Sequence, residues 1–170
     1  MERREEPLMR EVQYFRQPWL WGLVVLLAAF SWYSFIVQIA MHRPVGDNPA
    51  PDLVVVLVWL TLGLGVVVFF WRARLITEVR SDGLYVRFVP FHRRPRRLPF
   101  ARMVRFEACT YRPLREYGGW GIRYGKRGKA YNVSGNRGVQ LEFTDGKRLL
   151  IGSQQPEMVV RAMQEASGRR

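Results

Sequence analysis

The sequence predicts a membrane α-helical hairpin followed by a mainly β barrel that ends in one C-terminal helix. Residues 19–41 and 53–71 are two long apolar runs without a charged side chain, which is typical of membrane spans. After residue 72, short runs alternate apolar and polar side chains with the period of a strand. The last segment changes to the period of a helix. These three observations define the expected fold class.

Composition limits the classes of protein that need to be considered. The 170 residues include 27 Lys+Arg, 14 Asp+Glu and one Cys, which gives a formal net charge of +13. A single cysteine excludes an internal disulfide framework, and the apolar content excludes a disordered chain. The length allows one modest domain in addition to a membrane anchor.

The two apolar runs are each about as long as a helix that crosses the hydrocarbon core of a bilayer. Residues 42–52 between them are rich in helix-breaking Pro and Gly, so we expect an external loop that joins transmembrane helix 1 (19–41) to transmembrane helix 2 (53–71). A pair of buried helices in a soluble protein is one alternative, but no nearby segment could cover helices that are apolar all round. A cleaved signal peptide is another, but the first run follows a polar segment with four Glu.

The distribution of Lys and Arg predicts the orientation of the hairpin. The N-terminal segment, residues 1–18, has four Arg, the loop has only Arg43, and three Arg follow the second run within residues 72–80. Because Lys and Arg accumulate on the cytoplasmic side, we expect both termini in the cytoplasm. The expected membrane-interface residues are Trp19, Trp21, Trp71, Arg72 and Arg74.

The apolar runs contain no ionisable group, which argues against a transport pathway. Ser31, Ser34 and Gln38 share one helical face, and the second run offers Thr61 and Gly63. Small and weakly polar residues of this kind favour close helix–helix packing.

Residues 72–170 form the expected cytoplasmic β domain, with 22 Lys+Arg against eight Asp+Glu. The turn Asp145-Gly146 is a strong hairpin signal, and the helical stripe of Val159, Ala162, Met163 and Ala166 predicts a C-terminal helix. We expect this helix to cap an open end of a curled antiparallel sheet. The predicted strands are residues 74–80, 84–91, 98–111, 119–124, 129–134, 138–143 and 147–152.

The sequence also resembles a known family. Residues 117–123, 130–141, 145–148 and 151–154 are similar to the signature block of uncharacterised bacterial membrane proteins with two spans and a pleckstrin-homology-like (PH-like) domain. The resemblance implies a PH-like barrel of about seven strands closed by one helix. It also implies a multi-pass protein of the bacterial inner membrane, but it implies no activity.

Two basic segments are candidate binding sites for anionic lipid or for a partner. The first is an arginine cluster that could contact anionic headgroups or simply reinforce the orientation of the spans: Arg93, Arg94, Arg96 and Arg97. The second is a glycine-rich stretch, residues 118–128, whose glycines could serve a binding surface or mark bulges and close backbone approaches. Its basic and aromatic candidates, with the residue that follows, are Trp120, Arg123, Lys126, Arg127 and Lys129.

No catalytic residue, metal site or cofactor site is predicted, because the chain lacks a nucleophile–base pair and any metal-ligand spacing. Cys109 lies in a predicted strand and is expected to be a core residue. We therefore expect a non-enzymatic binding or adaptor protein, anchored in the membrane, whose basic domain faces membrane lipids or an acidic protein partner. The alternative is a small subunit or assembly factor of a larger membrane complex that uses the hairpin as its interaction surface, with another protein or a second copy of the chain as partner. The membrane tether argues against nucleic acid.

Overall fold

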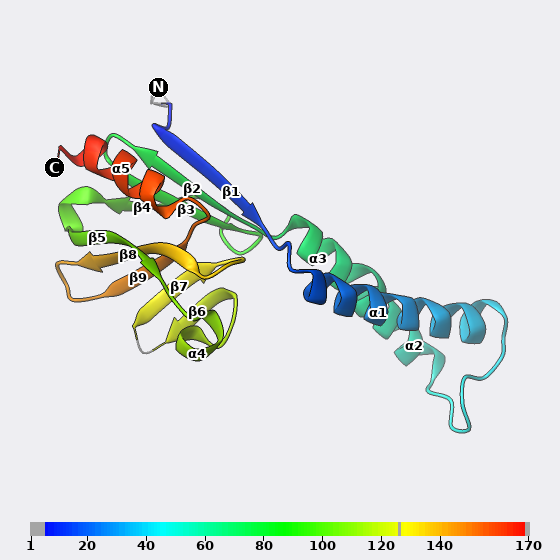
Figure 1. The fold of residues 1–170 in the computed structure, drawn as a ribbon. Coiled ribbons are helices and arrows are strands. Elements are labelled where there is room, and N and C mark those ends of the chain that lie inside the picture. Colours follow the sequence, from blue (N-terminus) through cyan, green and yellow to red (C-terminus); the bar gives the residue numbers. More distant parts are fainter. Residues whose placement is uncertain (1–5, 126, 169–170) are drawn as a thin grey trace. The chain divides into compact units, whose positions relative to one another are not determined.

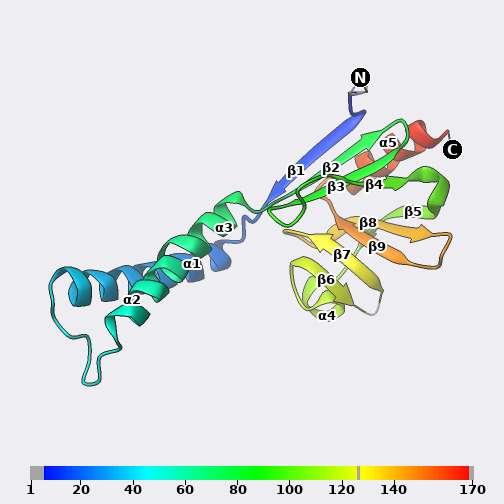
Figure 2. The same ribbon diagram turned by 180° about the vertical axis from the view of Figure 1, so that it is seen from behind.

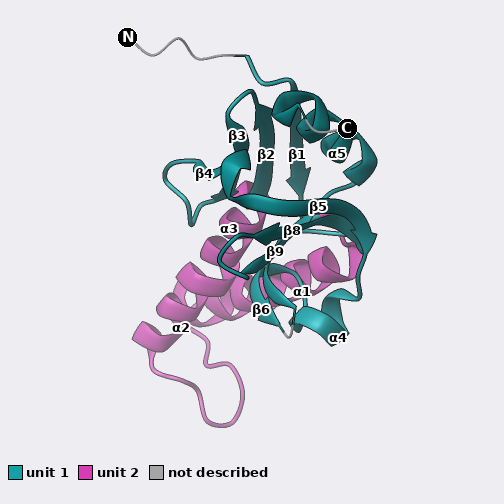
Figure 3. Ribbon diagram, turned by 90° about the vertical axis from the view of Figure 1, so that its left-hand side faces the viewer, with its two compact units in different colours: residues 1–15, 73–170 teal, residues 16–72 magenta. Residues whose placement is uncertain are grey.

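A computed structural model describes residues 6–125 and 127–168 of the chain. The chain divides into two compact units, one made of Met1–Phe15 with Ala73–Arg170 and the other of Arg16–Arg72 (Figure 3). The first is the β unit and the second is the helical hairpin. Each unit is described separately below.

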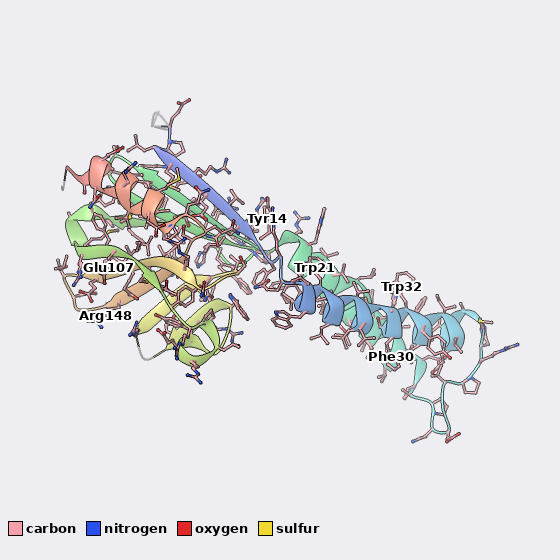
Figure 4. The ribbon with its side chains drawn as sticks, viewed as in Figure 1. Tyr14, Trp21, Phe30, Trp32, Glu107 and Arg148 are labelled. Carbon is pink, nitrogen blue, oxygen red and sulfur yellow. The ribbon has the colours of Figure 1, made fainter. Side chains whose placement is uncertain are left out.

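The hairpin consists of two continuous helical segments, Pro18–Ala40 and Asp52–Arg72. Both are long and apolar enough to cross a membrane, and only 11% of each apolar stretch is buried within the structure. Phe30 and Trp32 are two residues apart, which places them on opposite sides of α1 (Figure 4). The first segment comprises α1 (Pro18–Phe35) and η1 (Ile36–Ala40), and the second comprises α2 (Asp52–Val58), η2 (Trp59–Gly65) and α3 (Val66–Arg72).

The two helical segments pack through a small residue and stacked aromatic rings. A Cβ atom on Gly63 would lie 2.8 Å from Ser31 Oγ, and the rings of Phe35 and Trp59 stack with centroids 4.2 Å apart. The Gln38 side chain donates to the carbonyl of Ala50 and, at 2.8 Å, to Asp52 Oδ1. Ser34 and Thr61, by contrast, donate hydrogen bonds within their own helices. Ser31 likewise donates to the carbonyl of Ala28 in its own helix, so Gln38 provides the polar contact with the second segment, and Ser31 contributes close packing against Gly63.

The β unit contains two sheets (Figures 1 and 2). The first is antiparallel, in the order β1-β2-β3-β4, with strands β1 (Met9–Tyr14), β2 (Arg74–Arg80), β3 (Gly83–Val89) and β4 (Arg96–Pro99). The second has the order β5-β8-β9-β7-β6, in which β7 and β9 run parallel. Its strands are β5 (Met103–Thr110), β6 (Gly121–Gly125), β7 (Gly128–Asn132), β8 (Arg137–Phe143) and β9 (Arg148–Gly152).

The prediction of a closed barrel is wrong. The sequence predicts one long strand over residues 98–111, whereas the structure interrupts it with the short 3-10 helix η3 (Phe100–Arg102). This turn follows Pro99, which has no N–H to donate to a ladder. Hydrogen bonding is therefore not continuous between β4 and β5, and the strands form two separate sheets with open edges.

The N-terminal strand β1 was not predicted. The sequence predicts only that residues 1–18 are a cytoplasmic N-terminal segment, but within it Met9–Tyr14 pairs with β2 over its whole length. The buried Gln13 side chain donates a 2.7 Å hydrogen bond to the carbonyl of Gly152, and Ser153 Oγ donates to the Glu11 carboxylate at 2.6 Å. Strand β1 thus belongs to the first sheet by its backbone and contacts the end of β9 by its side chains.

The C-terminal helix α5 (Pro156–Ser167) contacts β2 and β3 of the first sheet and β5 and β8 of the second. Its predicted apolar stripe is confirmed, since Val159, Ala162 and Met163 are buried. Helix α5 therefore packs against both sheets, and a second, short helix, α4 (Pro113–Tyr117), precedes β6.

Candidate functional site

A pocket of about 500 Å³ opens between the two sheets of the β unit. The first sheet contributes Val86, Arg96 and Leu98, and η3 contributes Arg102. The second sheet contributes Lys129 and Tyr131 of β7 and the hairpin between β8 and β9. The remaining lining residues are Phe143, Thr144, Asp145, Lys147, Arg148 and Leu149. We call this the intersheet pocket.

The intersheet pocket carries a large excess of positive charge. Its charged lining side chains are one carboxylate, Asp145, and five cations: Arg96, Arg102, Lys129, Lys147 and Arg148. Two of these cations are already paired, because Lys147 Nζ lies 2.6 Å from Asp145 and Arg148 Nε lies 2.9 Å from Glu142. Within residues 6–125 and 127–168, the other three form no ion pair. The net field in the pocket therefore favours an anion.

Aromatic side chains hold Lys129 in the pocket. Its ammonium lies 5.0 Å from the ring centroid of Tyr124 and 4.9 Å from that of Tyr131. Burial opposes the charge on Lys129, but hydrogen bonds with the two tyrosine hydroxyls outweigh it and raise the pKa of the ammonium. Arg96 Nη1 donates a 3.2 Å hydrogen bond to the Tyr131 hydroxyl, which joins the two sheets at this point. Both cations are positioned by neutral groups that leave their charge uncompensated.

A second hollow, of about 590 Å³, adjoins the intersheet pocket and shares Lys129, Lys147 and Arg148 with it. Its other lining residues come from the turn between β6 and β7 and from Gly146. Arg127 belongs to this lining and lies 3.5 Å from Glu116. Figure 4 marks Arg148, one of the shared cations, on β9. The two hollows thus form one cationic surface.

The structure brings together only part of the predicted binding set. Of the nine residues proposed to bind lipid or a partner, Arg96, Arg127 and Lys129 line the two hollows. Arg97 pairs instead with Asp82 at 2.8 Å. Trp120 donates its indole N–H to the carbonyl of Gly135, and Arg123 donates to the carbonyl of Trp120. Lys126 lies outside the described residues.

The remaining predicted residues lie elsewhere. Arg93 and Arg94 are exposed in the segment between β3 and β4. Among the residues assigned to a membrane interface, Trp21 is half-buried and the other four are exposed: Trp19, Trp71, Arg72 and Arg74.

The glycine-rich stretch makes close backbone contacts. A Cβ on Gly125 would lie 2.0 Å from the carbonyl oxygen of Glu116, and one on Gly128 would lie 2.3 Å from that of Arg148. Gly118 ends α4 in the left-handed conformation at φ +70°. These positions favour the structural interpretation of the glycines over a phosphate-binding loop.

The segment Pro90–Pro95 between β3 and β4 lies at a defined end of the first sheet. The register aligns Tyr14 with Arg74 and Arg74 with Val89, so this segment lies at the end where β1 finishes and β2 begins. Both chain connections to the hairpin leave from the same end, because α1 begins at Pro18 and α3 ends at Arg72. We call Pro90–Pro95, with its exposed Phe91, Arg93 and Arg94, the arginine loop.

A family model describes residues 1–168, almost the whole chain. The chain belongs to the family of unknown function DUF6141. Searches of curated proteins and of solved structures gave no match. The family assignment covers both the hairpin and the β unit, and it names no ligand.

Sequence reasoning missed several pocket residues of this DUF6141 chain. Arg102, Lys147 and Arg148 were not among the candidates, although Lys147 and Arg148 directly follow the Asp145-Gly146 turn that the sequence did predict. Basic residues flanking a tight turn were the available signal. Arg102 gave no such signal, because it reaches the pocket only through the unpredicted turn η3.

Among the described residues, no group of three or more His, Cys, Asp and Glu side chains could hold a metal ion. Cys109 is a half-buried free thiol on β5, and burial raises its pKa.

The buried His92 contacts the pocket residue Tyr131 and should make the stability of the DUF6141 chain pH-dependent. Its Nδ1 accepts the N–H of Phe88 at 3.1 Å, and its ring meets that of Tyr131 edge-on. Burial, Arg96 and Lys129 lower the pKa of His92 in the folded state. Protonation of His92 therefore favours the unfolded chain. The stability that the neutral imidazole contributes to the folded chain is lost as the pH falls below the pKa of a histidine in the unfolded chain, about 6.5.

We expect the full chain in detergent to unfold at a lower temperature at about pH 5.5 than at about pH 7.5. The variant His92→Asn, whose amide oxygen can accept the same N–H, should lose most of that pH dependence. An equal pH dependence in both proteins would contradict the assignment to His92.

Proposed function

We propose that this protein is a membrane-anchored, non-enzymatic binding protein whose basic β unit contacts anionic lipid headgroups at the cytoplasmic face of the bacterial inner membrane. The helical hairpin is the anchor in this proposal. Strand β1 precedes α1 and strand β2 follows α3, yet the two strands pair. Their pairing requires both ends of the hairpin to emerge on one side of a bilayer that it crosses, which supports an even number of spans.

The charge distribution supports the cytoplasmic side for the β unit. The loop between the helices has a single basic residue, Arg43, whereas residues 72–170 contain 22 Lys and Arg. The positive-inside rule counts basic residues near the ends of the spans, and here they accumulate on the side of the β unit.

The PH-like resemblance is part of this proposal. Two sheets, the first with four strands, and a C-terminal helix that packs against both support it. The unit differs from the closed barrel that the resemblance implies, because β4 and β5 are separated by η3 and belong to different sheets.

The position of the arginine loop carries the proposal. This loop contains an aromatic side chain, Phe91, which is 60% exposed, and two exposed basic side chains, Arg93 and Arg94. It lies at the end of the first sheet from which the chain enters and leaves the hairpin, with Ala73 as the single residue between α3 and β2. Exposed aromatic rings favour the headgroup region, and each basic residue near an anionic surface contributes about 1 kcal/mol.

A fluorescent label at position 91 tests this contact. In the full-length Cys109→Ala chain we expect a label on Phe91→Cys to move to shorter emission wavelength in phosphatidylglycerol-containing vesicles, but not in pure phosphatidylcholine. Added salt and the double substitution Arg93→Glu, Arg94→Glu should each reverse most of the shift.

Leu8 offers a matched control position. It is also apolar and 59% exposed, but it adjoins Val79 at the opposite end of the first sheet. A label on Leu8→Cys should not respond to the lipid charge. Equal shifts at positions 8 and 91, or no shift at either, would refute a specific contact through the arginine loop.

A further inference from the structure

We infer that the intersheet pocket is a binding site for a small phosphate ester, separate from the membrane contact proposed for the arginine loop. The first argument is charge. Arg96, Arg102 and Lys129 line the pocket and form no ion pair within the described part of the chain. Three cations held near one another repel each other, so an anion that binds among them relieves this repulsion.

The chemistry of the donors favours phosphate over other anions. A guanidinium presents planar pairs of N–H groups that match two oxygens of a phosphate, and an ammonium adds a concentrated charge. Arg96 uses one nitrogen for the Tyr131 hydroxyl and keeps other donors free. Lys129 is fixed over the rings of Tyr124 and Tyr131. Arg96 and Lys129 come from different sheets and are positioned before a ligand arrives, which reduces the entropy cost of binding.

The apolar part of the lining indicates an ester rather than a bare ion. Val86, Leu98, Phe143 and Leu149 face the same pocket as the cations. A volume of about 500 Å³ lies within the range of small-molecule sites and is too small for a folded partner. The phosphate would lie among Arg96, Arg102 and Lys129, and the organic group would lie against the apolar wall.

The adjoining hollow provides for a second negative charge. It shares Lys129, Lys147 and Arg148 with the intersheet pocket and adds Arg127. Lys147 and Arg148 are engaged by Asp145 and Glu142 through exposed ion pairs, which are weak and can open to a ligand. A diphosphate or a diester with a further anionic group would reach both hollows. The same chemistry occurs in soluble phosphorylated molecules and in phospholipid headgroups.

Titration of the full chain in a neutral detergent tests the site. Two probes separate the sources of the phosphate: phenyl phosphate represents soluble phosphate esters, and short-chain phosphatidic acid represents lipids. We expect at least one probe to bind with a Kd that rises with salt concentration. Binding of phenyl phosphate assigns a soluble source, and binding of phosphatidic acid alone assigns a lipid source. Failure of both probes to bind would overturn the inference.

Two neighbouring arginines of β4 provide the matched variants. Arg96 lines the pocket, whereas Arg97, the next residue, pairs with Asp82. We expect Arg96→Gln to weaken binding about tenfold or more and Arg97→Gln to change it less than about twofold. Equal weakening by both substitutions would indicate a non-specific response to net charge and would overturn the proposal.

A third variant distinguishes loss of ligand binding from loss of folding. Arg102 makes no side-chain hydrogen bond or ion pair within the described residues, so Arg102→Gln removes a pocket charge without removing a contact of the fold. We expect it to lower affinity while leaving the unfolding temperature of the ligand-free chain unchanged. The double substitution at Arg93 and Arg94 should leave phenyl phosphate binding intact, so that failure of the membrane contact and failure of this site remain distinguishable.

Discussion

Deletion of residues 6–15 should unfold the β unit while leaving the helical hairpin intact. The deletion removes the whole of β1 and exposes the edge of β2, a strand whose residues are largely buried. It also removes the buried Gln13, which donates to the carbonyl of Gly152, and Phe15, whose ring meets that of Phe88. Loss of an edge strand with its buried contacts exceeds the usual effect of one substitution and approaches the total stability of a small domain.

Trypsin digestion of the full chain in detergent would measure this effect. Residues 72–170 contain 22 Lys+Arg, so an unfolded β unit offers many cleavage sites. We expect rapid loss of the β unit in the deletion variant and slow loss in the parent chain. Persistence of the protease-resistant β unit without β1 would show that the strand is dispensable.

Two point substitutions in β1 separate its buried and exposed faces. Gln13→Ala should destabilise the unit by about 1–3 kcal/mol, because the carbonyl of Gly152 loses its buried donor. Arg10, which is 57% exposed and lies 3.3 Å from Glu78, is the control, and Arg10→Ala should change stability by less than about 1 kcal/mol.

This result matters for any attempt to isolate the basic domain. The sequence suggests that residues 72–170 form a domain by themselves, because they follow the second apolar run without interruption. The structure shows that strand β1, which precedes the first run, completes the same sheet. A short N-terminal segment with four Arg and four Glu shows no strong alternation, so only the tertiary pairing with β2 reveals it as a strand.

The elements with strong local signals were predictable. Strand β2 has the predicted bounds, Arg74–Arg80, and the Asp145-Gly146 turn forms with Gly146 at φ +76°. The stripe of α5 follows from side-chain period alone, because one face of a helix must be buried. Each of these signals lies within about a dozen neighbouring residues.

The site depended on contacts that the sequence does not encode locally. Arg96 and Tyr131 are 35 positions apart and belong to different sheets, yet they share a hydrogen bond. Arg96 and Arg97 are neighbours in one arginine cluster, but alternate residues of a strand face opposite sides, so only Arg96 lines the pocket. The pocket lies between two sheets that separate at η3, and the periodicity of the sequence does not predict that break.

Substitution of Gly128 by Ala should destabilise the β unit far more than substitution of Gly135 by Ala. Both glycines have positive φ, +100° and +72°, which costs an L residue about 1–2 kcal/mol. They differ in space, because a Cβ on Gly128 would lie 2.3 Å from the Arg148 carbonyl oxygen, whereas Gly135 has nothing within 4 Å. The collision forces apart the neighbouring backbones of β7 and β9 and adds about 1–3 kcal/mol.

Thermal unfolding of the two variants in the same detergent measures the difference, since the cost shared by both glycines cancels. We expect the unfolding temperature of Gly128→Ala to fall by at least about twice as much as that of Gly135→Ala. Equal losses of stability, combined with a selective loss of phenyl phosphate binding in Gly128→Ala, would instead identify the glycine-rich stretch as a binding surface. The pair of variants thus decides between the two interpretations that the sequence leaves open, because space around the backbone, and not glycine content, distinguishes them.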